Sequence, residues 1–133
     1  MGRFQRIIPD SKVKKPSRVL LCSGKVYYEL EKRRAELGRD DVAIVRVEQL
    51  YPLPVVYWRT AVDQCDDGTP VYWVQEEPDN MGAWRLIKAR FGSMLFGRFP
   101  FSGVCRHESA SPATGSASCH KLEQQELLER AFA

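Results

Sequence analysis

The sequence has no long run of apolar residues. None of its apolar segments approaches the roughly 20 residues that a membrane-spanning helix needs, and the amino terminus has no apolar signal region. We therefore expect a cytoplasmic protein with no membrane partner. Hydrophobic residues make up 44% and charged residues 28% of the 133 residues, a balance typical of one soluble globular domain.

The four cysteines also lack the spacing of a metal site. Cys22, Cys65, Cys105 and Cys119 lie far apart, and no C-x-x-C pair occurs among them. A disulfide framework is not expected in a chain of this length and hydrophobicity. We predict no metal site, and we expect most of these cysteines to be buried free thiols.

The charge is too evenly balanced to indicate nucleic-acid binding. The formal net charge is only +3, and no stripe of aromatic residues alternates with the basic ones. Basic residues gather near the start, where residues 12–17 have the composition of a connector. We interpret residues 1–17 as a basic lead-in or linker and residues 18–133 as the domain.

The usual catalytic and nucleotide-binding motifs are missing. Ser23-Gly24-Lys25 follows an apolar run, but the earlier glycine of a phosphate-binding loop is absent. No dinucleotide fingerprint or serine elbow occurs. Cys119 and His120 are adjacent, so their side chains point apart and make a poor nucleophile–base pair. From these residues we predict no catalytic or cofactor-binding set.

What the chain does contain is an alternation of strand and helix patterns. Short apolar runs are followed by segments with helical spacing, which favours an α/β fold with a mostly parallel sheet and helices on its faces. The predicted strands are residues 18–22, 41–48, 71–74 and 99–105. The predicted helices are residues 26–37, 55–65, 83–96 and 120–132.

The stretch from Val71 to Trp84 organises the rest of the chain. A buried strand over residues 71–74 runs into Gln75, Glu76 and Glu77. Polar groups just past a strand's carboxyl end mark the usual place where an open α/β sheet meets ligands and partners. We therefore select this turn as the candidate functional motif.

The rest of this motif has the chemistry of a rigid turn. Pro78 has no N–H and ends the strand ladder. Asp79 or Asn80 is expected to cap the next helix, Gly82 allows a close turn, and Trp84 begins the helix. His120 is expected to open the last helix and to fix the small-residue loop before it by hydrogen bonding.

Two interpretations of Glu76 and Glu77 remain open at this point. The carboxylates either cap a helix and pair with basic side chains at an interface, or they act as a general acid and base. The second interpretation needs a raised carboxyl pKa and a nearby nucleophile or cofactor. The neighbouring sequence offers neither of them.

Several segments resemble one known family. Residues 21–30, 41–54 and 73–84 closely resemble the carboxyl-terminal region of 2-oxoglutarate dehydrogenase, the decarboxylase component that uses thiamine diphosphate. Residues 4–9 are similar to the segment that precedes this domain. The tail resembles the family's ending at Arg106, residues 109–113, Gly115, His120, Gln124, Gln125, Ala131 and Phe132.

This resemblance implies a fold and a role. The fold would be that of the transketolase carboxyl-terminal domain: three layers, with a twisted, mostly parallel sheet of about five strands between helices. The domain would pack against the rest of the dehydrogenase and help to build its homodimer. Gln75, Glu76, Glu77, Asn80, Gly82, Trp84 and His120 would then form an interface and turn motif.

The resemblance also implies that the chemistry lies elsewhere. The family decarboxylates 2-oxoglutarate on thiamine diphosphate and passes a succinyl group to a lipoyl group on its partner, dihydrolipoyl succinyltransferase, in the citric acid cycle. The diphosphate and magnesium are held by an earlier domain. We therefore expect a catalytically silent chain that is a piece of a larger assembly.

An alternative role is a regulatory module that binds an acyl-CoA or a nucleotide. In some relatives such a ligand binds beside this domain, at positions that match Arg3 and Gln49 here. A basic pair in those relatives is replaced by Val56 and Tyr57, which removes two phosphate-pairing cations.

A domain that packs against other domains is also expected to expose apolar surface when alone, and therefore to self-associate. We predict Tyr51, Leu53, Trp58 and Trp84 as part of that surface.

Overall fold

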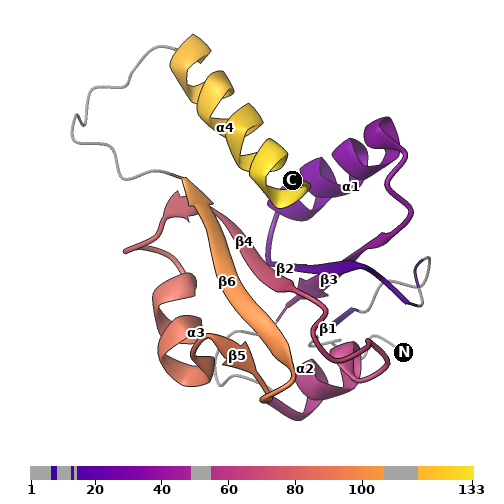
Figure 1. The fold of residues 1–133 in the computed structure, drawn as a ribbon. Helices are drawn as coiled ribbons and strands as arrows, with labels where there is room; N and C mark the ends of the chain where they lie inside the picture. The colour runs from indigo at the N-terminus through magenta and orange to yellow at the C-terminus, as the bar shows by residue number, and fades with distance from the viewer. Residues whose placement is uncertain (1–6, 9–12, 14, 49–54, 107–116) are drawn as a thin grey trace, which may run out of the picture.

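A sheet of six strands runs through the structure, a computed structural model that describes residues 7, 8, 13, 15–48, 55–106 and 117–133. The strand order is β1-β3-β2-β4-β6-β5 (Figure 1). The four parallel strands are β2 (Arg18–Cys22), β3 (Val42–Val47), β4 (Val71–Pro78) and β6 (Phe99–Arg106). Two short antiparallel strands form the edges, β1 (Ile7–Ile8) and β5 (Met94–Leu95).

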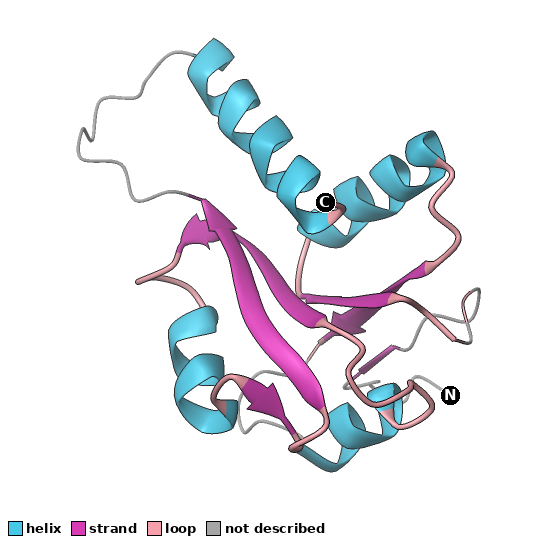
Figure 2. Ribbon diagram, in the orientation of Figure 1, coloured by secondary structure: helices cyan, strands magenta, loops and turns pink. Residues whose placement is uncertain are grey.

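Four helices cover the two faces of this sheet, so the predicted three-layer α/β fold is confirmed (Figure 2). Helices α1 (Val26–Leu37) and α4 (Ala117–Ala131) lie on one face. Helices α2 (Val55–Val62) and α3 (Trp84–Phe91) lie on the other. No helix in the described ranges is both long enough and apolar enough to cross a bilayer.

The sheet separates two hydrophobic cores because successive side chains of a strand point to opposite faces. In β2, Val19 and Leu21 join the core beneath α2 and α3, whereas Leu20 and Cys22 join the core beneath α1 and α4. All four are at most 2% exposed. Full burial of an apolar side chain stabilises the fold by about 1.5–3 kcal/mol. A run of apolar residues is therefore a strong sign of a buried strand, and it predicted β2 correctly.

Two tryptophans that we predicted to be exposed are in fact buried. Trp58 is 2% exposed and stacks between Trp73 and Phe91, with ring centroids 6.1 and 4.9 Å away. Trp84 is 4% exposed. The prediction was wrong because α2 and α3 are short helices, and each packs against the sheet through its large tryptophan side chain. Tyr51 and Leu53, the other two residues of that prediction, lie outside the described residues.

The helix predicted over residues 83–96 is also shorter in the structure, because α3 ends at Phe91. Gly92 follows it with φ 72° and ψ −154°, a conformation open essentially to glycine alone. Leu95 then pairs with Phe99 in an antiparallel hairpin, which Phe96 and Gly97 close with φ of 55° and 70°. Met94 and Leu95 therefore belong to a strand, although their spacing fits a helix.

The other predicted boundaries differ by a few residues. Helix α2 ends at Val62 rather than at residue 65, and α4 runs from Ala117 to Ala131 rather than from 120 to 132. Strand β4 continues past residue 74 to Pro78, which pairs with Arg106 after a shift in register. Helix α1 ends as predicted, with Gly38 in the left-handed conformation at φ 64°.

Two arginines fasten the end of α4 to the beginning of the sheet. Arg18 donates to the carbonyl oxygen of Ala131 at 2.8 Å and to that of Ala133. Arg39 donates to the carbonyl oxygen of Phe132 at 2.7 Å. Cationic donors satisfy the free carbonyls and the negative end of the helix dipole. The chain's last turn is therefore bound to β2 and to the residue after Gly38.

Candidate functional site at the carboxyl edge of the sheet

The parallel strands end at one edge of the sheet, where the candidate motif lies. β2 lies between β3 and β4, so the connections leaving β2 and β3 run in opposite directions across the sheet. Ligands of open α/β sheets usually bind at such a reversal point. A cavity of about 300 Å³ lies here, lined by Ser23, Lys25, Glu76 and Glu77 among others.

Gln75 is the central residue of the motif and is only 4% exposed. Its Oε1 accepts a hydrogen bond from the Trp73 indole Nε1 at 3.0 Å. The same oxygen accepts the backbone N–H of Trp84 at 2.8 Å. Trp84 is the first residue of α3, so a side chain nine residues earlier satisfies the free amide at the helix start.

The amide nitrogen of Gln75 binds the turn from inside. Nε2 lies 3.2 Å from the carbonyl oxygen of Glu77, 2.8 Å from that of Pro78 and 2.7 Å from that of Met81. The two hydrogens of Nε2 are thus shared among three acceptors. Every polar atom of the side chain is used to hold the turn, so Gln75 has no capacity left for a ligand.

Gly82 fits closely against this amide. Its φ is 68°, which L side chains rarely adopt, and an added Cβ would lie 3.1 Å from the Gln75 side-chain amide. The prediction that Gly82 permits a close turn is therefore explained by both its backbone conformation and its contact with Gln75.

The predicted helix cap differs from the observed one. Asp79 or Asn80 was expected to cap α3, but Ala83 occupies the cap position and makes no side-chain hydrogen bond there. The prediction was wrong because Gln75 already supplies the acceptor that the helix start requires. Asp79 instead lines a cavity of about 370 Å³ with Arg106 and Arg130.

Trp84 anchors the end of the turn in the core. Its ring meets Phe101 edge to face, with centroids 5.3 Å apart. It also lies directly over Gly103, where an added Cβ would come within 2.5 Å of the indole. Gly103 was not singled out from the sequence. A glycine inside a predicted strand is the signal that indicates such a close approach.

Glu76, Glu77 and Asn80 lie on the outside of the turn. Glu77 and Asn80 are exposed and Glu76 is half-buried. Glu76 lines the cavity at the reversal point and also a second cavity of about 660 Å³ between α1 and α4. These side chains are therefore available for contact with a partner.

His120 belongs to a separate polar junction. Its Nδ1 lies 3.0 Å from Nη1 of Arg106, at the end of β6. Arg106 also donates to Gln124, and Gln124 donates to Glu29 of α1. The junction links β6, α4 and α1. The loop that His120 was expected to fix lies outside the described residues.

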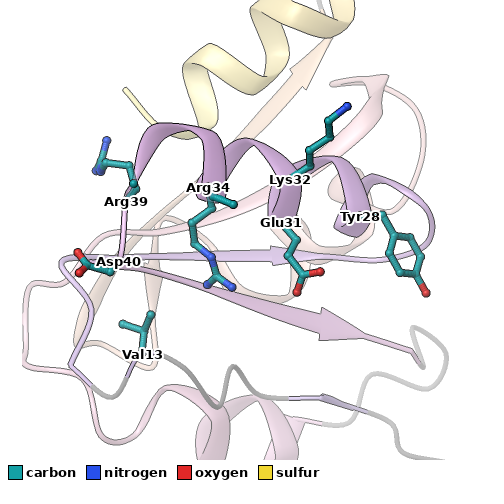
Figure 3. A pocket seen from close by; sticks show the side chains of 9 residues that line it. Val13, Tyr28, Glu31, Lys32, Arg34, Arg39 and Asp40 are labelled. Carbon is teal, nitrogen blue, oxygen red and sulfur yellow. The ribbon is translucent and has the colours of Figure 1, made fainter.

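A fourth cavity lies along α1, away from the motif. It measures about 590 Å³, and Figure 3 shows Glu31 and Arg34 pointing from α1 toward the sheet, with Val13 opposite. Arg34 is 8% exposed and donates to the carbonyl oxygen of Val42 at 3.0 Å. Arg34 therefore holds α1 against β3, and we interpret this cavity as a gap left by helix packing and not as a ligand site.

Cys22, Cys65 and Cys105 are free and buried, as expected. Burial raises the pKa of the Cys22 thiol to about 12 and that of Cys105 to about 11. It also raises the pKa of Cys65. At neutral pH these three thiols are protonated and poorly nucleophilic. Among the described residues, no three histidine, cysteine, aspartate or glutamate side chains are grouped as metal ligands.

Comparison with known proteins decides the family. The profile of the family described as "2-oxoglutarate dehydrogenase C-terminal" matches residues 1–132. The chain belongs to this family. The resemblance seen in residues 21–30, 41–54 and 73–84 is thereby confirmed.

Curated relatives of the family are much longer than this chain. One from Mycobacterium sp. strain JLS, named "Multifunctional 2-oxoglutarate metabolism enzyme", is 43% identical over 125 residues, covering 93% of this chain and 10% of the relative. A protein of the same name from Mycolicibacterium vanbaalenii is 41% identical over 119 residues, covering 89% and 10%. The chain thus spans about a tenth of the relatives that it matches.

The alternative regulatory site is not visible in the described part of the chain. Arg3 and Gln49, the two candidate ligand-binding residues, lie outside it. Val56 and Tyr57, which replace the basic pair, are 73% and 48% exposed on α2.

Proposed function

We propose that this chain is the carboxyl-terminal structural domain of a 2-oxoglutarate dehydrogenase decarboxylase. In this role it packs against the remaining domains of the dehydrogenase and helps to hold the homodimer together, and it is inactive alone. The family match supplies the context for this proposal. The relatives are named for 2-oxoglutarate metabolism. We propose an activity of this kind for the complete enzyme and not for this chain alone.

The observation that carries the proposal is a rigid turn with an apolar tip. Gln75 holds the backbone of the turn from inside through three carbonyl contacts. At the tip, Met81 is 57% exposed. A preorganised loop that presents an exposed apolar side chain loses little conformational entropy on binding. Such a turn is suited to docking on another protein surface.

The cofactor of the complete enzyme does not fit the cavity at the reversal point. Thiamine diphosphate carries a diphosphate, which in this cavity would face the two carboxylates of Glu76 and Glu77 and only one cationic group, that of Lys25. The amide of Gln75 is already fully used by the turn. We therefore propose that thiamine diphosphate and magnesium are held by other domains, and that this chain binds neither.

The proposal also covers the partner proteins and the cellular location of the complete enzyme. The complete enzyme would decarboxylate 2-oxoglutarate in the cytoplasm, within the citric acid cycle, and transfer succinyl groups to the lipoyl groups of dihydrolipoyl succinyltransferase. This chain would contribute contacts within that assembly.

A reconstitution experiment tests the structural role. A chain carrying the thiamine-diphosphate-binding domains is purified with and without this chain, and carbon dioxide release from 2-oxoglutarate is measured in the presence of thiamine diphosphate and magnesium. We expect activity only when the two chains are combined. Met81→Asp is expected to weaken their association by roughly tenfold or more, because it places a charge at the centre of the contact.

The matched control is Leu122→Asp, since Leu122 is 65% exposed on α4. This variant should associate as the wild-type chain does. Activity that does not depend on this chain would contradict the proposal. So would carbon dioxide release by this chain alone.

A further inference from the structure

Helix α3 carries an unusual distribution of charge. Its eight residues include Arg85, Lys88 and Arg90 and no acidic residue. Trp84 and Ile87 point into the core, at 4% and 0% exposure. The three basic side chains are all exposed. The solvent side of this helix is therefore cationic along its whole length.

The cations of α3 flank a small apolar strip. Leu86 is 44% exposed, and Ala89 is exposed beside it, three positions further along the helix. Arg85 and Arg90 lie on the two sides of this strip by helical geometry. We call these four residues, Arg85, Leu86, Ala89 and Arg90, the α3 face. In Figure 1 the helix lies on the outer side of the sheet, next to β5 and β6.

Several other arginines on the described surface are paired with acids, although exposed Arg59 instead lies over the Phe96 ring. Arg33 pairs with Glu36 within α1, and Arg130 pairs with Glu126 within α4, each at 3.8 Å. Arg98, after the β5–β6 turn, binds Asp63 at 3.1 Å and Asp67 at 2.6 Å.

Arg85 and Arg90 take no part in any ion pair or side-chain hydrogen bond recorded for the described residues. The nearest acid along the chain, Asp79, lines a cavity with Arg106 and Arg130 instead. The α3 face therefore offers two uncompensated guanidinium groups around an apolar strip.

We propose that the α3 face docks an acidic segment of a partner protein, one that presents carboxylates around an apolar side chain. Guanidinium groups bind carboxylates in bidentate geometry, which gives both strength and orientation. Leu86 between them provides the apolar contact that the centre of a protein interface requires. A nucleic-acid backbone has no apolar group to place on that strip. The inference stands on α3 alone and does not rest on the proposed function.

The test uses the whole chain and a synthetic helical peptide with glutamate and leucine at helical spacing. Binding is followed by fluorescence anisotropy at low and at physiological salt. We expect Arg85→Glu with Arg90→Glu to weaken peptide binding by roughly tenfold or more, because each change turns attraction into repulsion. Leu86→Ser should weaken it by about fivefold, since it removes apolar contact area.

The matched control is Lys32→Glu with Lys121→Glu, which makes the same change in net charge at exposed positions of α1 and α4. It should bind the peptide as the wild type does. Circular dichroism confirms that every variant is folded. The proposal is overturned if the wild type does not bind, or if the control loses as much affinity as the α3 variant.

Two competing occupants would also overturn it. One is nucleic acid: binding of single-stranded oligothymidine with the same dependence on Arg85 and Arg90 would show simple polyanion attraction. The other is a second copy of this chain, because α4 exposes Leu122 beside Glu126 and Glu129. Self-association that is lost in both Arg85→Glu and Glu129→Arg would assign the α3 face to that contact.

Discussion

Two neighbouring strands of the sheet end in polar clusters of opposite kinds. Within β4, the neutral amide of Gln75 is 4% exposed and bonds to two donors and three acceptors. At the last residue of β6, the charged side chain of Arg106 is 11% exposed and binds the exposed His120 and the half-buried Gln124. Both clusters join the end of a strand to a helix, but the second is more open to water.

The difference teaches that burial, more than charge, determines how much a polar cluster stabilises a fold. A buried donor or acceptor left without a partner costs about 1–3 kcal/mol. A single hydrogen bond whose lost partner water can replace contributes less, about 0.5–1.5 kcal/mol. We therefore expect the Gln75 cluster to dominate the stability of the carboxyl edge.

Replacing the glutamine of each cluster by leucine should give the largest difference in stability between the two clusters. Gln75→Leu leaves the Trp84 amide and three carbonyl oxygens without their partner, so we expect a loss of about 3 kcal/mol in the free energy of unfolding. Gln124→Leu in the half-buried junction should cost less, about 1 kcal/mol, because water can reach the groups that it leaves without a partner. Urea unfolding followed by circular dichroism measures both. Equal losses would contradict the role that we assign to burial.

A second test addresses the packing beneath the turn. Gly103→Ala places a methyl group 2.5 Å from the Trp84 indole, so the ring must move. Overpacking of this kind costs about 1–3 kcal/mol. Tryptophan fluorescence during urea unfolding should report both the shift of the ring and the loss of stability. Ser102→Ala, at an exposed position of the same strand, is the control and should leave stability nearly unchanged.

A third test separates backbone strain from crowding. Gly82 and Gly38 have nearly the same φ, 68° and 64°, but only Gly82 contacts another side chain at its missing Cβ. Alanine at either position should cost about 1 kcal/mol for the left-handed conformation. We expect Gly82→Ala to lose more than Gly38→Ala in thermal unfolding, because the methyl group also displaces Gln75. If Gly38→Ala lost more, the contact with Gln75 would have no energetic importance.

The smallest expected effect concerns a surface pair at the opposite edge of the sheet. The Arg39 guanidinium, 2.9 Å from Asp41, and the Ser17 hydroxyl, at 2.6 Å, hold the pKa of the Asp41 carboxyl well below its usual range. A lowered folded-state pKa contributes stability above the unfolded value of about 3.9, and that stability is lost as the pH falls below it. Asp41→Asn should therefore lower the melting temperature most at pH 7, and the difference from the wild type should shrink progressively as the pH falls below about 4 toward the lowered folded-state pKa. The prediction would be contradicted if the difference in melting temperature between Asp41→Asn and the wild type grew as the pH fell.

The sequence was sufficient for the core fold because buried parallel strands carry a strong pattern. Residues 18–22 and 99–105 were predicted as strands close to their observed bounds. Residues 19–22 are all apolar and buried, and residues 99–105 keep Phe99, Phe101, Val104 and Cys105 buried although Pro100 and Ser102 are exposed. The hairpin of β5 escaped prediction because Phe96, rather than asparagine or glycine, begins its turn. Phe96 tolerates φ of 55° while its ring packs against Phe91 at 5.8 Å, a tertiary contact that no local pattern reveals.

The structure brings several residues of the candidate motif together, but the structural roles within it were not all foreseen. Gln75, Gly82 and Trp84 do come together in one turn, as the sequence indicated. The helix cap was assigned to Asp79 or Asn80 because capping rules consider only the nearest residues. Gln75 acts across nine positions, and only the folded turn brings its amide to Trp84.

The two arginines that hold the last carbonyl groups have a consequence for synthesis of the chain. Arg18 and Ala131 are 113 positions apart, so the bond between them forms only after nearly all of the described chain has been made. The core beneath α1 and α4 likewise needs Leu127, Leu128 and Phe132. Because a chain emerges from the ribosome amino end first, its earliest parallel strand must wait for α4 with this core covered by α1 alone. Aggregation during translation is thus the hazard that this architecture carries.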